Sequence, residues 1–302
     1  MLQNTLLTGA QGFLGAYIQK SLANAGYRVD TLGRGTGNTV VCDLGKEIPA
    51  LNNTYTAVVH AAGKAHIVPK TEEEKKAFFD VNLEGTRRLL TALEGLAQLP
   101  QTFVFISTIG VYGLSTGESI SETHPLNATD PYGQSKIQAE ALVRQWCTKN
   151  GVNYFSLRLP LISGANAPGN LGSMRKAIQK GYYFRIGKGS ARKSIVLAKD
   201  VANFIPLLFT KNQVGEYNLT DGVHPTFAQI EDKVAQLINS KVKIKIPAFI
   251  ARLVSIVGDI IPKFPLNSRQ YYKITSPLTF SDQKARTELG WNPNTFLESP
   301  IT

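Results

Sequence analysis

Two side chains near the middle of the chain could act together as an acid/base pair. They are Tyr132 and Lys136, in the segment DPYGQSK that begins at Asp130. Aspartate is a good helix N-cap and proline suits the first helical turn, so the segment predicts the start of a helix. Residues four apart share one helix face, and there an ammonium would lower the pKa of a phenol from its usual ~10. The spacing therefore permits an acid/base pair, and it equally permits a chance pair of surface side chains; the rest of the chain must decide.

A glycine-rich turn near the N-terminus is the second informative segment. The residues TGAQGFLG, numbered 8–15, follow a short apolar run and have the spacing G-x-x-G-x-x-G. Gly9 permits a tight turn, Gly12 lets the backbone approach a pyrophosphate, and Gly15 lets a helix pack closely on a strand. The free N–H groups of that helix would bind the anion. The turn predicts a dinucleotide site, and an ordinary glycine turn is the alternative.

The end of the second predicted strand indicates which dinucleotide is preferred. Dinucleotide folds often place an acid there to bind the adenosine ribose, but this chain has Gly33 followed by Arg34. Glycine leaves room, and arginine offers a planar charge to a 2′-phosphate. We therefore expect NADP(H) to be slightly favoured over NAD(H), unless Arg34 only contacts solvent or the adenine face. Asp43 and Leu44 follow the next short strand and are expected to border the adenine.

Strand and helix patterns alternate along the first half of the chain. Apolar runs predict strands over 5–8, 28–32, 39–42, 57–60, 103–107 and 153–159, and longer patterns predict helices over 13–25, 75–96 and 131–150. Alternation of this kind predicts an α/β fold, a parallel sheet covered by helices on both faces. After residue 160 the pattern becomes irregular, which predicts a smaller lobe, although a segment such as 215–219 could return to the sheet.

Composition narrows the class of protein. The chain has 302 residues, 43% of them hydrophobic and 18% charged, which is typical of a soluble globular protein. Cys42 and Cys147 form no disulfide framework and no metal pattern, so we expect a reducing compartment, the cytoplasm. The N-terminal segment lacks the basic start of a signal peptide. The net charge of +11 suggests an anionic partner, and without basic runs interleaved with aromatics a phosphorylated small molecule is favoured over nucleic acid.

The apolar segment 248–261 is too short to span a bilayer, and Arg252 and Asp259 interrupt it. We interpret it as a buried or amphipathic helix. Lys241, Lys243 and Lys245 precede it, so contact with a membrane surface is the lesser alternative.

Further segments in the right order connect the glycine loop with the Tyr132–Lys136 pair. They are His60-Ala61-Ala62-Gly63, Val81-Asn82-Leu83-Glu84-Gly85-Thr86, Ser107-Thr108-Ile109-Gly110-Val111-Tyr112-Gly113 and Leu289-Gly290-Trp291-Asn292-Pro293. Over nearly its whole length the chain thus resembles the extended short-chain dehydrogenase/reductases, and within them the NAD(P)-dependent nucleotide-sugar epimerase/dehydratase family. The resemblance implies a Rossmann-like, doubly wound parallel sheet over residues 1–160 and a smaller, mostly helical substrate lobe over 161–302. It also implies a homodimer as the usual assembly.

The resemblance implies roles for individual residues. Thr108, Tyr132 and Lys136 are the expected catalytic residues: Tyr132 moves the proton, Thr108 shares the substrate oxygen, and Lys136 binds the nicotinamide ribose. The expected cofactor contacts are Gly9, Gln11, Gly12, Phe13, Leu14, Gly15, Arg34, Asp43, Leu44, His60, Ala61, Ala62, Gly63, Asn82, Ser107, Tyr132 and Lys136. His60 and His66 could suggest a metal, but their spacing fits no common site, so no metal is expected.

The expected substrate is a UDP-sugar, which contacts Thr108 together with Asn170, Leu171, Arg192, Lys193 and Arg269. Lys193 is in the position where relatives carry an arginine on the diphosphate. Hydride transfer at C4 of a UDP-hexose could serve a 4-epimerase or a 4-ketoreductase, and Gly33 with Arg34 tilts the expectation slightly to the ketoreductase. A dehydratase is less favoured because the segment at Thr108 carries no added carboxylate. A non-catalytic NADP-binding regulator is the alternative from another class.

Overall fold

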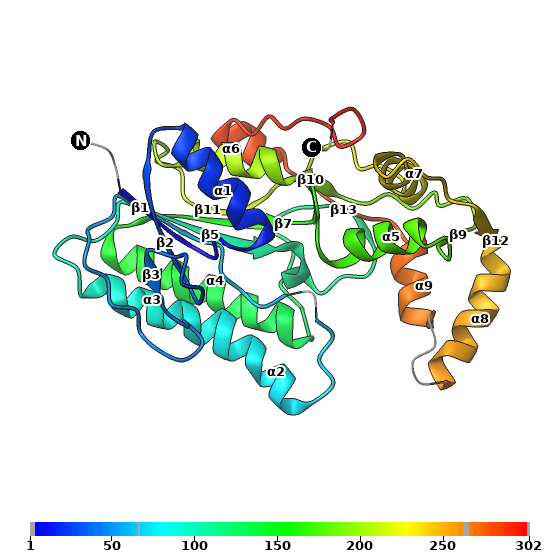
Figure 1. The fold of residues 1–302 in the computed structure, drawn as a ribbon, viewed down its shortest axis with the longest axis horizontal. Helices are drawn as coiled ribbons and strands as arrows, with labels where there is room; N and C mark the ends of the chain where they lie inside the picture. Colours follow the sequence, from blue (N-terminus) through cyan, green and yellow to red (C-terminus); the bar gives the residue numbers. More distant parts are fainter. Residues whose placement is uncertain (1–3, 66, 262–265, 301–302) are drawn as a thin grey trace.

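A seven-stranded parallel sheet lies at the centre of the molecule (Figure 1). The computed structural model describes residues 4–65, 67–261 and 266–300. The strand order β11-β7-β5-β4-β1-β2-β3 is that of a doubly wound α/β fold, so the predicted fold class is confirmed. The strands are β1 (Asn4–Thr8), β2 (Arg28–Gly33), β3 (Val40–Val41), β4 (Ala57–His60), β5 (Thr102–Thr108), β7 (Asn153–Leu159) and β11 (Gly215–Asn218). All four residues of β4 are buried, as expected for a central parallel strand.

Helices cover both faces of this sheet, and each face has its own hydrophobic core. One face carries α1 (Phe13–Asn24) and α6 (Ala198–Leu208); the other carries α2 (Glu72–Phe79), α3 (Gly85–Glu94) and α4 (Pro131–Asn150) (Figure 1). Leu14, Ile18 and Val201 are buried on the first face, and Leu89, Val143 and Trp146 on the second. The two cores fix the sheet between the helix layers.

The long helical pattern predicted over 75–96 is a continuous helical run with one irregular turn. A π-helical turn, η1 (Asp80–Glu84), lies between α2 and α3. It holds Asn82, which is only 2% exposed. The wider turn therefore directs an amide side chain into the interior, which is a recognised use of π-helical turns near functional sites.

Helix α4 begins and ends at the residues that its sequence predicts. The Asp130 carboxylate accepts a hydrogen bond from Gly133 N at 3.1 Å, and Pro131 is the first helical residue. Gly151 ends the helix with a φ of +65°, a backbone conformation that glycine adopts readily. The caps fix the rotation and position of the helix that carries Tyr132 and Lys136.

Most of the second half of the chain forms a lobe at one end of the sheet (Figure 1). It contains α5 (Gly169–Gln179), α7 (Phe227–Leu237), α8 (Ala248–Ile260) and α9 (Ser268–Thr275), with short helical turns η2 (Ile109–Tyr112) and η3 (Ala285–Leu289) elsewhere. Three small parallel pairs join its segments: β8 (Leu161–Ser163) with β10 (Ile195–Leu197), β9 (Phe184–Ile186) with β12 (Ile244–Ile246), and β6 (Gly117–Ile120) with β13 (Leu278–Phe280).

Two later segments belong to the sheet side of the molecule. Strand β11 pairs with β7, as the sequence suggested for 215–219. Trp291 packs against Phe204 of α6, with ring centroids 4.8 Å apart. The chain thus crosses between sheet and lobe more than once, and the boundary near residue 160 stays a prediction.

Three expectations from composition can be compared with the structure. Cys42 and Cys147 are both buried, free thiols. None of the helices in the described ranges has the length and apolar character to cross a bilayer. Helix α8 forms where a buried or amphipathic helix was predicted, but it is not buried: most of its large apolar side chains are exposed.

Candidate active site

The candidate residues gather where the parallel strands end. Thr8, Gly33, His60 and Thr108 are the last residues of β1, β2, β4 and β5. Because all these strands run in one direction, their carboxyl ends meet at one edge of the sheet. In doubly wound folds this edge is where ligands bind.

The glycine loop fits a pyrophosphate. Gly9 has a φ of +75°, and a Cβ there would lie 2.7 Å from Ala62 N, so only glycine fits. A Cβ on Gly15 would overlap the Gly9 carbonyl, which shows how closely α1 approaches the loop. Gly12 is the N-cap of α1, and no side chain caps this end. The first N–H groups of α1 are therefore left for an anion.

Gln11 and the loop after β2 form the expected adenosine side of the site. Gly33 occupies the strand-end position where many dinucleotide folds carry an acid. A Cβ built on Gly33 would lie 3.0 Å from the Asn38 side chain, so an amide lies next to this position. The Gln11 amide lies against Gly35. Arg34 is exposed and makes no ion pair or hydrogen bond within the part of the chain that the structure describes. Its guanidinium remains available to a phosphate.

Asp43 and Leu44 differ in what they offer to a ligand. The Asp43 carboxylate is half-buried and accepts a hydrogen bond from Gly45 N at 3.1 Å. The Leu44 side chain is buried in the core beneath α3, and its carbonyl accepts a hydrogen bond from Arg88 at 3.0 Å. Leu44 therefore fixes the loop, while Asp43 stays at its surface.

His60 is a structural histidine whose two ring nitrogens are both occupied. The Thr86 hydroxyl donates to Asn82 O at 2.7 Å, so it accepts from Nε2–H of His60 at 2.9 Å. Nδ1 then accepts from the Thr8 hydroxyl at 2.6 Å. Burial, together with the charge of Lys136, lowers the pKa of His60 to about 3, so the ring is neutral.

No metal site is seen near His60. The described residues contain no cluster of three or more His, Cys, Asp or Glu side chains that could hold a metal ion. The second histidine of the sequence argument, His66, lies outside the described residues.

Asn82 joins the loop after β4 to the helix that carries the catalytic pair. Its amide accepts from Lys64 N at 2.7 Å and donates to Lys64 O at 3.1 Å. It also donates to the Ser135 hydroxyl at 3.0 Å, which in turn donates to Tyr132 O at 2.8 Å. Ala61, Ala62 and Gly63, which lead into Lys64, are thus held beside the N-terminus of α4.

Thr108, Tyr132 and Lys136 lie in one region, at the end of β5 and the start of α4. The Thr108 side chain and the Tyr132 ring both lie near Gly110: a Cβ built on this glycine would be 3.3 Å from Thr108 Oγ1 and 3.7 Å from Tyr132 Cε1. Thr108 Oγ1 also accepts from Gly110 N at 3.0 Å, which fixes its rotamer. Lys136 lies deeper: its Nζ donates to Ile106 O at 2.6 Å and sits 4.0 Å from the centre of the Phe105 ring. Thr108 and Tyr132 therefore lie close together, and Lys136 is buried on the face of α4 that carries Tyr132.

Burial acts on the pKa of the phenol against the two positive charges, Lys136 and the nicotinamide, that the family resemblance implies will lower it. Burial raises the pKa of Tyr132, although the nearby Thr108 side chain opposes the shift. Burial lowers the pKa of Lys136 to about 7, and the nearby carboxylate of Glu140 opposes that shift. In the protein alone Tyr132 thus holds its proton at neutral pH, and an added positive charge beside the phenol is needed to release it.

A buried charged network behind Ser107 was not predicted. Ser107 Oγ donates to Glu140, whose carboxylate binds Arg158 with Nη2–Oε2 at 2.7 Å. Arg158 also donates to the Tyr112 hydroxyl at 3.0 Å, and this hydroxyl donates to Asn218 at 2.8 Å. Ser107 therefore supports the site from behind, and Glu140 connects Lys136 to the core.

One signal for this network was present in the sequence. Glu140 follows Lys136 by four residues, so Tyr132, Lys136 and Glu140 share one face of α4. The pairing of Ser107 with Arg158 depends on the register of β5 with β7, which local sequence does not reveal.

The candidate substrate residues have different surroundings. Asn170 is exposed in the first turn of α5, and Leu171 beside it is buried in the core between α5 and α7. The loop before α5 reaches the glycine-loop helix, since Ala165 N donates to the Tyr17 hydroxyl at 2.9 Å. The Asn170 side chain is therefore accessible to a ligand, whereas the Leu171 side chain packs in the hydrophobic core.

Lys193 is not a free cation, which corrects the expectation that its ammonium meets a diphosphate. Its Nζ is buried and donates to Lys273 O at 2.8 Å and Ser276 O at 2.6 Å, the last carbonyls of α9. Burial lowers the pKa of Lys193 to about 8. Arg192 is exposed, with Nη1 3.3 Å from Val223 O, and Arg269 is exposed on α9. These two guanidinium groups are the better candidates for a diphosphate.

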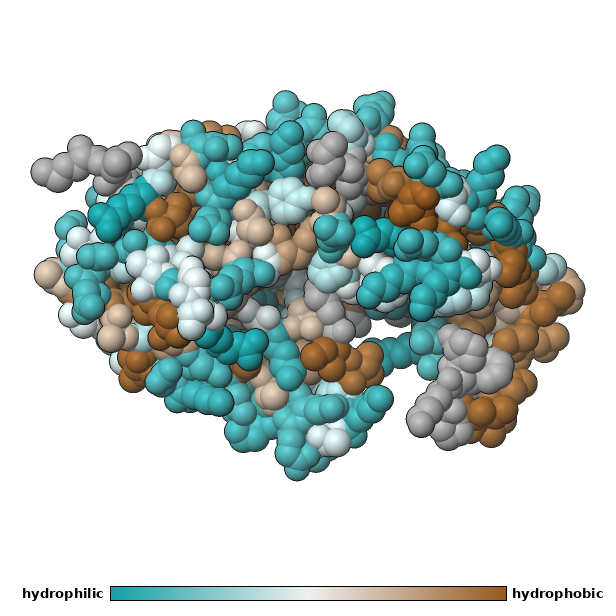
Figure 2. Space-filling view, viewed as in Figure 1, coloured by the Kyte–Doolittle hydropathy of each residue, from teal (hydrophilic) through white to brown (hydrophobic). Residues whose placement is uncertain are grey.

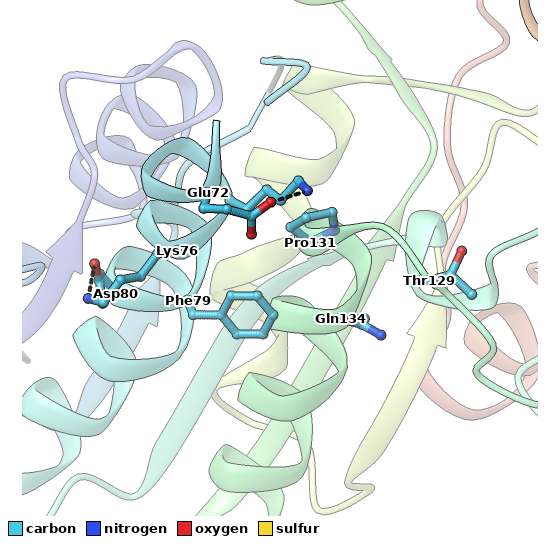
Figure 3. A pocket seen from close by; sticks show the side chains of 8 residues that line it. Glu72, Lys76, Phe79, Asp80, Thr129, Pro131 and Gln134 are labelled. Atoms are coloured by element: carbon cyan, nitrogen blue, oxygen red, sulfur yellow. Dashed lines mark hydrogen bonds and ion pairs between the residues drawn. The ribbon is translucent and has the colours of Figure 1, made fainter. Parts of the chain in front are cut away.

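A groove of about 650 Å³ between α2 and α4 lies beside the catalytic helix (Figure 3). Pro131 and Gln134 line it, but Tyr132 does not. Two ion pairs also border it: Glu72–Lys75 within α2, and Lys76 of α2 with Asp80 of η1 (Figure 3). The groove is thus a charged outer surface and contributes no group to the proton pathway.

Comparison with known proteins identifies the family of this chain. Residues 5–220 match the model of the NAD dependent epimerase/dehydratase family. The chain is 28% identical over 277 residues to N-acetyl-alpha-D-glucosaminyl-diphospho-ditrans,octacis-undecaprenol 4-epimerase of Escherichia coli O157:H7, covering 87% of this chain and 81% of that protein. It is 26% identical over 315 residues to UDP-glucose 4-epimerase of Vibrio cholerae, covering 97% and 92%.

The solved structure of MoeE5 in complex with UDP-glucose and NAD has the same fold, with a TM-score of 0.75, 19% identity, and coverage of 97% of this chain and 94% of that one. The glycine loop at the end of β1, the Thr108–Tyr132–Lys136 group and the family match over more than two thirds of the chain agree. The chain belongs to the NAD-dependent epimerase/dehydratase family.

Proposed function

We propose that this enzyme transfers hydride at C4 of a UDP-hexose, and that its net reaction is the reduction of a 4-keto sugar with NADPH. The observation that carries the proposal is the grouping of three side chains: Thr108 and the Tyr132 ring lie near the same glycine, Gly110, and the buried Nζ of Lys136 donates to Ile106 O, two residues before Thr108. Two hydroxyls at one place can bind a single oxygen of a sugar. An ammonium nearby can offset the negative charge of a phenolate.

In the proposed reduction, the chain's own groups handle the proton and hold the sugar. Tyr132 donates its proton to O4, and Thr108 donates a hydrogen bond to the same oxygen. Lys136 holds the nicotinamide ribose and stabilises the phenolate that Tyr132 becomes. The bound nicotinamide supplies the hydride and, once oxidised, a positive charge near the phenol. The raised pKa of Tyr132 in the protein alone suits a proton donor.

The preference for NADPH is supported by the loop after β2. Gly33 presents no carboxylate that would repel a 2′-phosphate, and the guanidinium of Arg34 is exposed and available. A cofactor that is used once in each turnover must exchange with solvent. This agrees with net reduction better than with a reaction that regenerates its own cofactor.

UDP as the carrier is supported by the Vibrio cholerae relative, whose name specifies UDP-glucose. The Escherichia coli relative is named for a sugar on undecaprenyl diphosphate instead. Both names place a diphosphate on the sugar, so Arg192 and Arg269 suit either carrier.

A 4-epimerase is the second candidate, because both relatives are named 4-epimerases. It would need the same three catalytic residues, but the sugar would turn between two hydride transfers. A non-catalytic regulator is disfavoured, since Thr108, Tyr132 and Lys136 are all present and in contact or close packing.

The purified protein should be denatured and the released nucleotides analysed, and the folded protein should then be titrated with NADPH and NADH. The ketoreductase predicts little retained cofactor and tighter binding of NADPH, with Arg34→Ala weakening NADPH alone. Retained NAD(H) in a ratio near one per chain would instead support the epimerase and contradict the assignment of Arg34. Turnover is then followed with UDP-4-keto-hexoses, UDP-hexoses and the same sugars on undecaprenyl diphosphate.

A further inference from the structure

Helix α8 is turned with its large apolar side chains outward. Six of them are 40–78% exposed, and we call them the α8 face: Phe249, Ile250, Leu253, Ile256, Val257 and Ile260. The helix instead packs on the lobe through Ala251 and Ser255, both 1% exposed. Ordinary surface helices bury their apolar stripe and expose their polar one.

The α8 face is continuous. At 3.6 residues per turn, its six side chains fall within an arc of about 120°, and Arg252 and Asp259 lie together at one border of that arc. Figure 2 shows hydrophobic surface at the end of the molecule where Figure 1 places α8. A contiguous apolar patch of this kind marks a place where something binds.

The segment that contains this apolar face is strongly basic. Residues 241–276 contain seven Lys or Arg and one Asp, a net +6 out of the +11 of the whole chain. Lys241, Lys243 and Lys245 are exposed, directly before α8, and line an open groove of about 1130 Å³ between α7 and β12. More than half of the protein's net charge therefore belongs to the segment of the sequence that contains α8.

We propose that the α8 face docks on the surface of an anionic lipid bilayer, with the helix lying in the plane of the interface. A 13-residue helix is only about 20 Å long, which is too short to cross the hydrocarbon core but suited to lie on it. Apolar side chains would enter the boundary between headgroups and acyl chains, while the lysines would contact the negative headgroups.

Charge favours the bilayer over a second copy of the chain. Two copies joined through α8 would bring two segments of net +6 together, and like charges at an interface oppose association. An anionic bilayer supplies the opposite charge and an apolar layer at once. The inference goes beyond the proposed function and does not depend on it, because no residue of the α8 face belongs to the site described above.

The full chain should be sedimented with vesicles of phosphatidylglycerol and phosphatidylethanolamine, and separately with vesicles of phosphatidylcholine. Binding should be at least about tenfold stronger to the anionic vesicles and should weaken as salt is added. Leu253→Ser should lower the partition constant about tenfold. Leu207→Ser on α6 is the matched control, since Leu207 is 55% exposed and Leu253 62%, and it should leave binding unchanged.

A second pair of variants tests the charge. Lys243→Gln with Lys245→Gln should weaken binding about 25-fold at low salt, at roughly fivefold for each lysine. Lys20→Gln with Lys149→Gln removes the same charge from other exposed positions and should have little effect.

Two results would overturn the proposal. Equal loss of vesicle binding in Leu253→Ser and Leu207→Ser would show that the α8 face is not the contact. A wild-type dimer in sedimentation velocity that Leu253→Ser converts to monomer, without vesicle binding by either protein, would make the face an interface between two copies.

Discussion

The ion pair between Glu140 and Arg158 connects the catalytic helix to the sheet, and Glu140→Gln is its sharpest perturbation. The substitution keeps the shape of the side chain and its bond to Ser107, but it removes the charge that faces Arg158. It also removes the carboxylate that raises the pKa of Lys136, so that pKa should fall below about 7.

The size of the effect follows from burial. Both side chains are 4% exposed, and Nε of Arg158 lies 3.2 Å from each carboxylate oxygen in addition to the Nη2 contact at 2.7 Å. Removing one partner of a buried pair leaves an uncompensated charge and costs about 3–5 kcal/mol. Since domains are stable by about 5–15 kcal/mol, the variant should lose a large part of its free energy of unfolding.

Urea unfolding, followed by circular dichroism, measures this loss. Glu72→Gln is the matched control, because Glu72 and Lys75 lie 2.6 Å apart but are 83% and 45% exposed, so it should cost about 0.5 kcal/mol or less. The double variant Glu140→Leu with Arg158→Met removes both buried charges and should regain much of the lost stability.

Similar losses in Glu140→Gln and Glu72→Gln would refute the reasoning, since the two pairs differ in burial and hardly in length. A double variant as unstable as Glu140→Gln would also refute it, because the cost would then not come from an unpaired charge.

Three other predictions concern the same region. Because the pKa of Lys136 falls from 10.5 to about 7 on folding, the unfolded chain binds more protons between these values, so this group makes stability rise with pH. Lys136→Met should remove that slope, up to ~1.4 kcal/mol per pH unit in urea titrations from about pH 7 to 10; an unchanged slope would contradict the assignment. Gly15→Ala should cost about 1–3 kcal/mol in the same assay because its Cβ overlaps a backbone carbonyl, whereas Gly95→Ala, whose nearest neighbour would be 3.5 Å away, should not. In ¹⁵N NMR the His60 ring should stay neutral, with its proton on Nε2, down to about pH 3; titration near pH 6.5 would contradict the hydrogen-bond chain.

Local sequence predicted the elements whose signals are local. The run Ala57–His60 is apolar throughout and forms β4 over the same residues. Helix α4 begins after Asp130, where its N-cap predicted, and it covers the predicted range, Pro131–Asn150. The glycine loop likewise lies at the end of β1, because its glycines fit only that close approach of helix and strand.

Features that depend on distant partners could not be read from the sequence. Lys193 looked like a phosphate ligand by register, but its partners are carbonyls more than 75 residues later in the chain. The π-helical turn at Asn82 depends on bonds to Lys64 and Ser135, which come from two other elements. The shift in the pKa of Tyr132 depends on burial, which the spacing of Tyr132 and Lys136 does not show.

The outward face of α8 shows a similar limit. The apolar character of residues 248–261 indicated a buried or amphipathic helix, but it did not indicate which side of the helix would contact the lobe. In the structure the small residues Ala251 and Ser255 contact the lobe, and the large apolar side chains of α8 are therefore exposed. Small residues allow close packing, and this explains why the helix is held by its narrower face.

The most direct test of the account is the proton-transfer role of Tyr132. Tyr132→Phe keeps the ring that packs 6.0 Å from Phe78 and removes only the hydroxyl. With NADPH bound and a UDP-4-keto-hexose added, single-turnover oxidation of the nicotinamide should slow by at least about 100-fold, while NADPH affinity changes by less than about threefold. A variant that transfers hydride at the wild-type rate would show that Tyr132 is not the acid, and the proposed mechanism would be wrong.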